Sequence, residues 1–312
     1  MAAPTLAAFS YALNSPLECL PALESLSHQT VAQQIHITVF APFSPPEFEE
    51  FHDRFAGFQV IEPEGETFGE LFAQFMRVSD APYLVYVEEH SEVYPDWAEK
   101  LLQAHLSGHP VVGFAIENGN PKSLISWVHL AVQFGHVTAP IPSGPVDFLA
   151  GHHVSYCREL LTKYQSGIVS LMEDETAFFL RLRQDGIPLF MCGEALSIHF
   201  HLARLQELLH LEYHGQKSFA ATRATQPGWS KLHSLVYSLA SPALPLVRLI
   251  RMAPNLKRLR LLQSYGFRFL ALTILVLLIG TLGEVLGYWL GEGSSPMGKT
   301  RYEFERRSLL RD

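Results

Sequence analysis

Two carboxylates and an imidazole follow directly on an apolar run of the chain. The run is Tyr83–Val87, which is rich in aromatic and β-branched residues, and Glu88, Glu89 and His90 come next. Such a run is typical of a buried strand in a parallel sheet, and ligands of open α/β sheets bind just beyond the carboxyl ends of these strands. Carboxylate oxygens and an imidazole nitrogen suit Mg²⁺ or Mn²⁺. The pattern therefore predicts a divalent metal site, and a polar loop that caps the strand is the alternative.

Three consecutive acids and two alternating histidines in the second half of the chain offer further ligands and a candidate base. Glu173, Asp174 and Glu175 lie at the start of a predicted helix. The helix dipole favours acids in a first turn, but a carboxylate there can also act as general base toward an acceptor hydroxyl. His199 and His201 end a predicted strand with both imidazoles on one face, because strand side chains alternate. They suit a metal or a pyrophosphate, and a structural pair is the alternative.

Short apolar runs alternate with helix-like segments in the first half of the chain, and these elements must position the groups above. The alternation is typical of a doubly wound α/β sheet. The predicted strands are Leu6–Ser10, Ile35–Phe40, Phe58–Ile61, Tyr83–Val87 and Val111–Ile116. The predicted helices are Pro16–His28, Glu47–Phe55, Phe68–Val78 and Pro95–Leu106. The less regular second half predicts a helix over Met172–Asp185, strands at Leu189–Cys192 and Ala195–Ile198, and a helix over 202–225.

A long apolar segment near the carboxyl terminus predicts attachment to a membrane. Phe267–Leu290 is mostly apolar, and as a helix it is roughly 36 Å long, enough to span a bilayer. Glu284 within it is costly in lipid unless it is paired or near the interface, so a buried or interfacial helix is the alternative. The preceding segment Leu232–Met252 is amphipathic. It could lie in the headgroup plane or pack on a soluble domain.

Charge is distributed unevenly along the 312 residues. Residues 1–212 hold 9 Lys/Arg and 26 Asp/Glu, so their formal charge is 9 − 26 = −17. Residues 213–283 hold 9 Lys/Arg and no acid, and residues 284–312 hold 5 of each, which gives the net charge of −8. A basic stretch beside an apolar segment predicts an anionic membrane surface as partner, and the acidic first part lacks the basic and aromatic groove of a nucleic-acid binder.

Cysteine use and the amino terminus indicate a cytoplasmic location for most of the chain. Cys19, Cys157 and Cys192 are odd in number, far apart and without a Cys-x-x-Cys pair. This pattern favours a reducing compartment without disulfides or a zinc knuckle. The first residues lack the basic region and apolar core of a signal peptide. We therefore expect residues 1–265 to lie at the cytoplasmic face of the cell membrane.

The order of motifs resembles that of a known enzyme family. The motifs are Asn14-Ser15-Pro16, Leu23–Leu26 with Gln29-Thr30, Glu88-Glu89-His90, Pro95-Asp96-Trp97, Gly151–Arg158, Glu173-Asp174, Leu180–Gly186, His199 with His201, and His214–Arg223. In this order they resemble the turns, metal motif, acceptor segment and Glu-Asp pair of family 2 glycosyltransferases, over roughly residues 5–225. Glu88-Glu89-His90 stands where most members have Asp-x-Asp.

The resemblance implies a GT-A fold: a Rossmann-like, mixed and mainly parallel sheet flanked by helices. It implies an inverting transfer of a sugar from a nucleotide-sugar donor to an acceptor hydroxyl. The predicted membrane attachment adds the expectation of a lipid-linked or envelope glycan as acceptor. Asp174 would be the catalytic base, with Glu173 as its substitute. The implied ligands of Mn²⁺ or Mg²⁺ are Glu89, His90 and His199. The implied nucleotide contacts are Asn14, Glu88, Arg158 and His201.

Two departures from the family pattern leave another function open. Ala41–Ser44 stands where the family has Asp-Asp-Gly-Ser, and Phe72-Ala73 replaces its Arg-Asn pair. A non-catalytic membrane-bound GT-A-fold protein is therefore the alternative, and a hydrolase on the same carboxylates is a third reading. The expected domains are a GT-A domain over 1–225, an amphipathic basic segment over 226–265, a transmembrane helix over 266–291 and a polar tail over 292–312.

Overall fold

A mixed sheet forms the centre of the first of two compact units. The computed structural model describes residues 5–225, 228–295, 298 and 302, and within them the strand order is β3-β2-β1-β4-β8-β6-β9-β5, with β7 paired to β9. The strands are β1 Leu6–Tyr11, β2 Ile35–Phe40, β3 Gly57–Ile61, β4 Tyr83–Tyr86, β5 Ser91–Val93, β6 Val111–Asn118, β7 Gly144–Val146, β8 Val154–Cys157 and β9 Leu189–His199. β3, β2, β1 and β4 are mutually parallel, and β8 is antiparallel to both β4 and β6.

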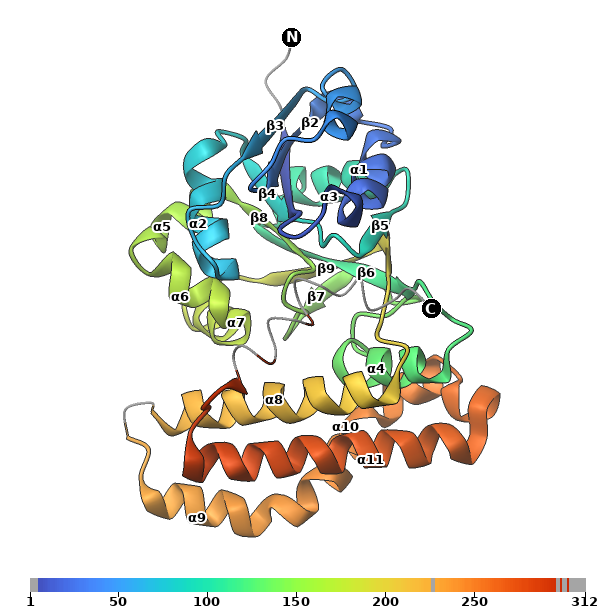
Figure 1. Cartoon of the computed structure of the whole chain (residues 1–312), viewed down its shortest axis with the longest axis vertical. Coiled ribbons are helices and arrows are strands. Elements are labelled where there is room, and N and C mark those ends of the chain that lie inside the picture. The colour runs from blue at the N-terminus through green and yellow to red at the C-terminus, as the bar shows by residue number, and fades with distance from the viewer. Residues whose placement is uncertain (1–4, 226–227, 296–297, 299–301, 303–312) are drawn as a thin grey trace. The chain divides into compact units, whose positions relative to one another are not determined.

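Helices cover both faces of this sheet (Figure 1). They are α1 Leu20–Ser27, α2 Phe68–Val78, α3 Trp97–Leu106, α5 Arg158–Lys163, α6 Ile168–Glu173 and α7 Glu175–Gln184. Side chains of β1 alternate between two layers: Ala8 joins the core under α1 and α3, whereas the Phe9 ring lies 4.7 Å from that of Phe75 in α2. α2 begins with a capping box between Thr67 and Glu70. The predicted α/β architecture is confirmed.

Two boundaries of the second half differ from the prediction. The helix predicted over Met172–Asp185 is interrupted at Asp174, whose backbone is non-helical (φ −127°, ψ 73°) and whose carboxylate accepts a hydrogen bond from Ala177 N. This cap starts a new helix, α7, after α6. The two predicted strands are one strand, β9, which continues through Gly193. A Cβ at Gly193 would lie 1.9 Å from Ile141 O, so this glycine permits a close backbone approach.

The second unit comprises residues 118–136 and the described residues from 200 onward, and it is helical. Its helices are α4 Leu124–Gln133, α8 Leu205–Ala224, α9 Lys231–Ala240, α10 Leu244–Arg258 and α11 Leu261–Leu290. α11 packs closely on α8 because it presents glycines: a Cβ at Gly283 would lie 2.2 Å from Tyr213 O, and one at Gly287 would lie 2.3 Å from Lys217 O. The predicted division at residue 225 falls inside this unit.

Among the described residues, two helical segments are long and apolar enough to cross a membrane, Lys231–Arg258 and Leu261–Leu290. The first was expected to lie in the headgroup plane or to pack on a soluble domain, and the second to span the bilayer, with a buried or interfacial helix as the alternative. Within α11, Glu284 is 3% exposed and its Oε2 accepts a hydrogen bond of 2.6 Å from Arg248 of α10. The predicted polar tail lies largely outside the described residues.

Candidate functional site

Three elements of the sheet bring an acid and two histidines together. Glu88 follows β4 at its carboxyl end, and His153 directly precedes β8, which runs antiparallel to β4. His199 is the last residue of β9 and pairs with Ser91, just beyond Glu88. Antiparallel pairing places the start of one strand beside the end of its neighbour. The three side chains therefore meet at the edge where sheets of this class bind ligands.

The donor atoms of this cluster have the spacing of a metal site. Glu88 Oε2 lies 2.9 Å from His199 Nε2 and 3.4 Å from His153 Nε2. One ligand atom from each of the three residues lies within 4.8 Å of the other two, and all three residues are buried. Donors about 2.1 Å from a small divalent ion are about 3 Å apart at adjacent coordination positions. Glu88, His153 and His199 could therefore hold such an ion.

The electrostatics of the cluster favour the protonation states that bind metals. Burial holds the pKa of the His199 imidazole well below its ordinary value, although Glu88 opposes this shift. Burial by itself would raise the pKa of the Glu88 carboxyl, but the facing His90, His199 and His153 hold that pKa well below its ordinary value. A neutral imidazole and an ionised carboxylate are the forms that ligate a metal ion. The donor set thus fits Mn²⁺, Mg²⁺ or another divalent ion that accepts nitrogen and oxygen.

The predicted metal ligands occupy two different positions around this cluster. His90 Nε2 lies 3.1 Å from His199 Nε2 and 3.6 Å from Glu88 Oε2, so His90 is part of the cluster. Glu89 Oε1 instead lies 2.9 Å from Nδ1 of His90, on the other side of that ring. A carboxylate on the far nitrogen of a metal-binding histidine fixes its tautomer and orientation. The centre of the cluster is formed by Glu88, which was expected to contact the nucleotide, and by His153, which is not among the predicted site residues.

A second buried carboxylate, Glu175, lies next to the cluster of Glu88, His153 and His199. Its Oε1 accepts a 2.7 Å hydrogen bond from Tyr156 OH, and its Oε2 accepts a 2.6 Å bond from His152 N. His152 Nδ1 in turn lies 3.4 Å from Glu88 Oε1, so one imidazole stands between the two acids. A Cβ at Gly151 would lie 2.6 Å from Glu175 Oε2, so only glycine fits there without a shift. Burial raises the pKa of the Glu175 carboxyl above its ordinary value, and His152 and Tyr156 partly oppose this.

His152 has a left-handed backbone with φ of 66°. This conformation is uncommon for a residue other than glycine and is found mainly where a turn or a site requires it. The centroid of its ring lies 4.1 Å from that of Phe68, with the two ring planes tilted by 40°. A small pocket beside the cluster is lined by Tyr86, Val87, Glu88, Ser91, Val93, Phe114, His152, His153 and Ser197. The strained residue thus forms part of the wall of this pocket.

The two acids predicted as bases face other partners. Asp174 Oδ1 accepts from Ala177 N as the cap of α7, and Glu173 Oε1 accepts a 2.6 Å hydrogen bond from Gly69 N of α2. The interruption between α6 and α7 directs the third acid of the run, Glu175, toward Glu88. The run of three acids predicted a base. The helix break that turns Glu175, and not its two neighbours, toward Glu88 has no signal in the periodicity of the sequence.

The remaining predicted residues are dispersed. Asn14 is exposed and follows β1, which is parallel to β4, so it lies at the same sheet edge as Glu88. Arg158 follows Cys157, which pairs with Tyr83 at the start of β4, and so it lies at the opposite edge. His201 belongs to the second unit, where its backbone N–H donates to Asn120 Oδ1.

Comparison with known proteins links the fold to glycosyltransferases. No protein-family model matches the chain, and no curated protein sequence matches it. Among solved structures, the mannosyltransferase PcManGT from Pyrobaculum calidifontis, in complex with GDP-Man and Mn²⁺, matches with a TM-score of 0.55 at 14% identity over 91% of this chain and 88% of that chain. TarS 1-349 from S. aureus, in complex with UDP, matches with a TM-score of 0.47 at 11% identity over 94% and 92% of the two chains. The first match shows that this chain has a GT-A-like glycosyltransferase fold, as predicted.

Proposed function

We propose that this protein is a metal-dependent inverting glycosyltransferase that uses a nucleotide-sugar donor. The observation that carries the proposal is the buried cluster of Glu88, His153 and His199 at the carboxyl end of β4. The mannosyltransferase of similar fold was solved with a nucleotide sugar and Mn²⁺, which supports the same class of donor and ion here. The donor sugar and the nucleotide base are left open by this proposal.

The metal-binding residues would act on the leaving group. Glu88, His153 and His199 would hold a divalent ion, with His90 beside them. When bound, this ion supplies positive charge that neutralises the diphosphate as the bond to the sugar breaks. Glu89 orients His90 through its Nδ1, and His152 stands between the metal cluster and Glu175.

The base would remove the proton of the acceptor hydroxyl. In an inverting transfer, the acceptor oxygen bonds to the anomeric carbon on the face opposite to the departing diphosphate, and the hydroxyl proton passes to the base. The sequence assigns this role to Asp174, with Glu173 as substitute. We assign it to Glu175, because its carboxylate lies beside the cluster and its pKa is raised by burial. A raised pKa makes a carboxylate a stronger proton acceptor near neutral pH.

A non-catalytic binding protein is the second candidate, and a specific observation favours it. Ala41 and Phe72 stand where the resembling family has polar groups for the nucleotide, and both are buried apolar side chains. Neither can hydrogen-bond a base or a ribose. If these positions are decisive, the fold would bind a different ligand and transfer no sugar.

Calorimetric titration of the full chain with a panel of nucleotide sugars separates the two candidates. We expect at least one uridine or guanosine diphosphate sugar to bind in the presence of Mn²⁺ and to lose most of its affinity when Mn²⁺ is removed with a chelator. The bound donor should then be consumed when acceptor glycans or lipids are added. Absence of binding across the panel, with and without Mn²⁺, would defeat the enzyme proposal and leave the binding protein.

We also propose that the second unit attaches the protein to an anionic membrane surface. The amphipathic α9 and α10 leave large apolar side chains exposed, among them Leu239 (73%) and Ile250 (63%). Residues 213–283 add nine basic side chains and no acid. Each basic group near anionic lipid contributes on the order of 1 kcal/mol, and salt screens it. The apolar contact with lipid is less sensitive to salt.

Flotation with vesicles tests this attachment. Leu239→Glu combined with Ile250→Glu should release the protein from anionic vesicles. Leu106→Glu is the matched control, because this leucine of α3 is 77% exposed but lies in the first unit. Equal flotation of the wild type, the double variant and the control would reject α9 and α10 as the lipid-contacting surface.

A further inference from the structure

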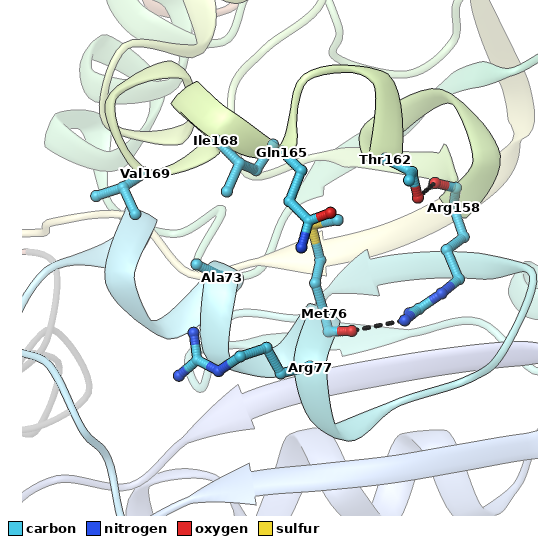
Figure 2. A pocket seen from close by; sticks show the side chains of 8 residues that line it. All are labelled: Ala73, Met76, Arg77, Arg158, Thr162, Gln165, Ile168 and Val169. Carbon is cyan, nitrogen blue, oxygen red and sulfur yellow. Dashed lines mark hydrogen bonds between the residues drawn. The ribbon is translucent and has the colours of Figure 1, made fainter.

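A second pocket of the first unit lies between α2 and the segment that contains α5 and α6 (Figure 2). Its volume is about 410 Å³, within the range of small-molecule sites. It is lined by Ala73, Met76, Arg77, Arg158, Thr162, Gln165, Ile168 and Val169. Arg158 follows Cys157, the residue of β8 that pairs with Tyr83 at the start of β4. It therefore lies at the edge of the sheet opposite to Glu88. The pocket is therefore separate from the metal cluster.

The lining combines positive charge with an apolar wall. Two of the described lining residues are arginines, and none of them carries a carboxylate. Met76 and Ile168 are buried and supply apolar surface, while Gln165 is exposed at the rim. Such a lining suits a ligand with a negatively charged group at one end and an apolar body at the other.

Arg158 is the group that an anion would contact. Its Nη2 donates a 2.7 Å hydrogen bond to Met76 O, which fixes the guanidinium plane (Figure 2). Its Nη1 is buried, and within the described residues it has no hydrogen-bond partner. The carboxylate of Asp80 lies 4.0 Å from Nη2 and is fully exposed, so it compensates the charge only weakly. A buried guanidinium N–H without an acceptor is unfavourable, and an oxyanion satisfies it well.

Arg77 provides an internal contrast in the same pocket. Its guanidinium is paired with Glu64, outside the pocket lining. Its guanidinium is thus in direct contact with an acid, whereas Arg158 lies 4.0 Å from the exposed Asp80. Figure 2 shows the Arg77 side chain extending away from the Met76 carbonyl that Arg158 contacts.

We propose that this pocket binds a small organic anion, with its phosphate or carboxylate group on Arg158 and its apolar body against Met76 and Ile168. Gln165 would lie beside the anionic group and offer its amide. The site needs neither the metal ion nor the nucleotide sugar, so it is independent of the proposed catalytic function.

Titration of the full chain with phenyl phosphate, benzoate and inorganic phosphate, all without Mn²⁺, tests the site. Phenyl phosphate or benzoate should bind at least about tenfold more tightly than inorganic phosphate, because the ring adds apolar burial. The organic anion that binds more tightly identifies the charged group. Equal affinity for all three, or no binding of any at millimolar concentration, would overturn the proposal.

Substitutions of residues that line the pocket test whether the anion binds there. Arg158→Gln should weaken it by about 10–100-fold, the usual effect of losing a charge-assisted hydrogen bond. Because Arg158 also holds the Met76 carbonyl, Gln165→Glu is a second test: this exposed position tolerates the change, and the new carboxylate should repel the anion. Arg77→Gln is the matched control and should change affinity by less than about threefold. Unchanged affinity in both Arg158→Gln and Gln165→Glu would place the anion elsewhere.

Discussion

Each unit of the protein buries a glutamate, and the two environments differ in the groups that face its charge. Glu284 of the helical unit receives hydrogen bonds from Arg248 on one oxygen and from Tyr288 on the other, so an opposite charge lies in direct contact. Glu88 of the α/β unit faces the imidazoles of His153 and His199, and one possible ligand atom of each residue lies within 4.8 Å of the other two. A buried charge that has an oppositely charged partner contributes to the packing of the helices. A group of ligand atoms that lie close together can instead receive a metal ion.

This difference shows that burial of a charge does not by itself mark a functional site. Glu284 lies in an apolar segment, where an ionisable residue is usually functional. Here its partner from α10 explains its presence through packing between helices. Glu88 instead faces three imidazoles: His90, His153 and His199 each have a nitrogen within 3.6 Å of its Oε2. The geometry of the neighbours, more than the depth of burial, separates the two roles.

The largest expected effect concerns Glu175, the acid beside the Glu88 cluster that we propose as the base. Glu175→Gln should lower turnover by about 10²–10⁴-fold while donor binding changes little, since loss of a general base affects the chemical step. Asp174→Asn should leave turnover nearly unchanged, because asparagine also caps a helix. Steady-state kinetics with calorimetric donor affinity measures both. If Asp174→Asn shows the loss and Glu175→Gln does not, the base is the one that the sequence assigns.

Breaking the pair in the helical unit should cost stability without touching metal binding. Arg248→Met leaves Glu284 buried without its cation, which usually destabilises by about 3–5 kcal/mol. The double variant with Glu284→Leu should recover much of this loss. Arg251→Met, at an exposed neighbouring position of α10, is the control. Denaturant unfolding measures the free energies, and a loss of Mn²⁺ affinity in Arg248→Met would contradict the separation of roles.

The Glu88 cluster should respond in the opposite way. At free Mn²⁺ about 100 times the dissociation constant, the ion should stabilise the wild type by about 2.7 kcal/mol. Glu88→Gln should abolish this stabilisation. Glu89→Gln should keep most of the stabilisation by Mn²⁺, because Glu89 contacts Nδ1 of His90, on the side of the ring away from the cluster. Thermal unfolding with and without Mn²⁺ tests this, and full retention in Glu88→Gln would remove Glu88 from the metal site.

A third buried group sharpens the contrast, with the smallest expected effect per pH unit. His105 is satisfied by the chain, because its ring nitrogens lie 2.8 Å from His109 O and from Ser155 Oγ. Burial lowers its pKa to about 4. A histidine with a depressed pKa stabilises the fold above its unfolded pKa of about 6.5, and this contribution is lost as the pH falls toward 4, by at most about 1.4 kcal/mol per pH unit. His105→Gln should flatten that part of the stability curve, and an unchanged slope would assign acid sensitivity to other groups.

The sequence by itself determined the features that depend on neighbouring residues. The apolar run Tyr83–Val87 contains the buried strand β4, and Glu88 stands just beyond its carboxyl end, because burial and strand direction follow from local pattern. The apolar character of α11 is equally local. The order of motifs over roughly residues 5–225 also resembles that of family 2 glycosyltransferases, and this resemblance implied the GT-A fold.

Tertiary structure alone decided which groups meet. His153 joins Glu88 through the antiparallel pairing of β8 with β4, and His199 joins it through the antiparallel pairing of β9 with β5. Strand register between distant segments leaves no trace in local periodicity. The helix break at Asp174 selected Glu175 among three adjacent acids. Glu284 proved compatible with an apolar helix because Arg248 arrives from another helix. In each case the deciding interaction joins segments far apart in the chain, where sequence pattern carries no information about distance.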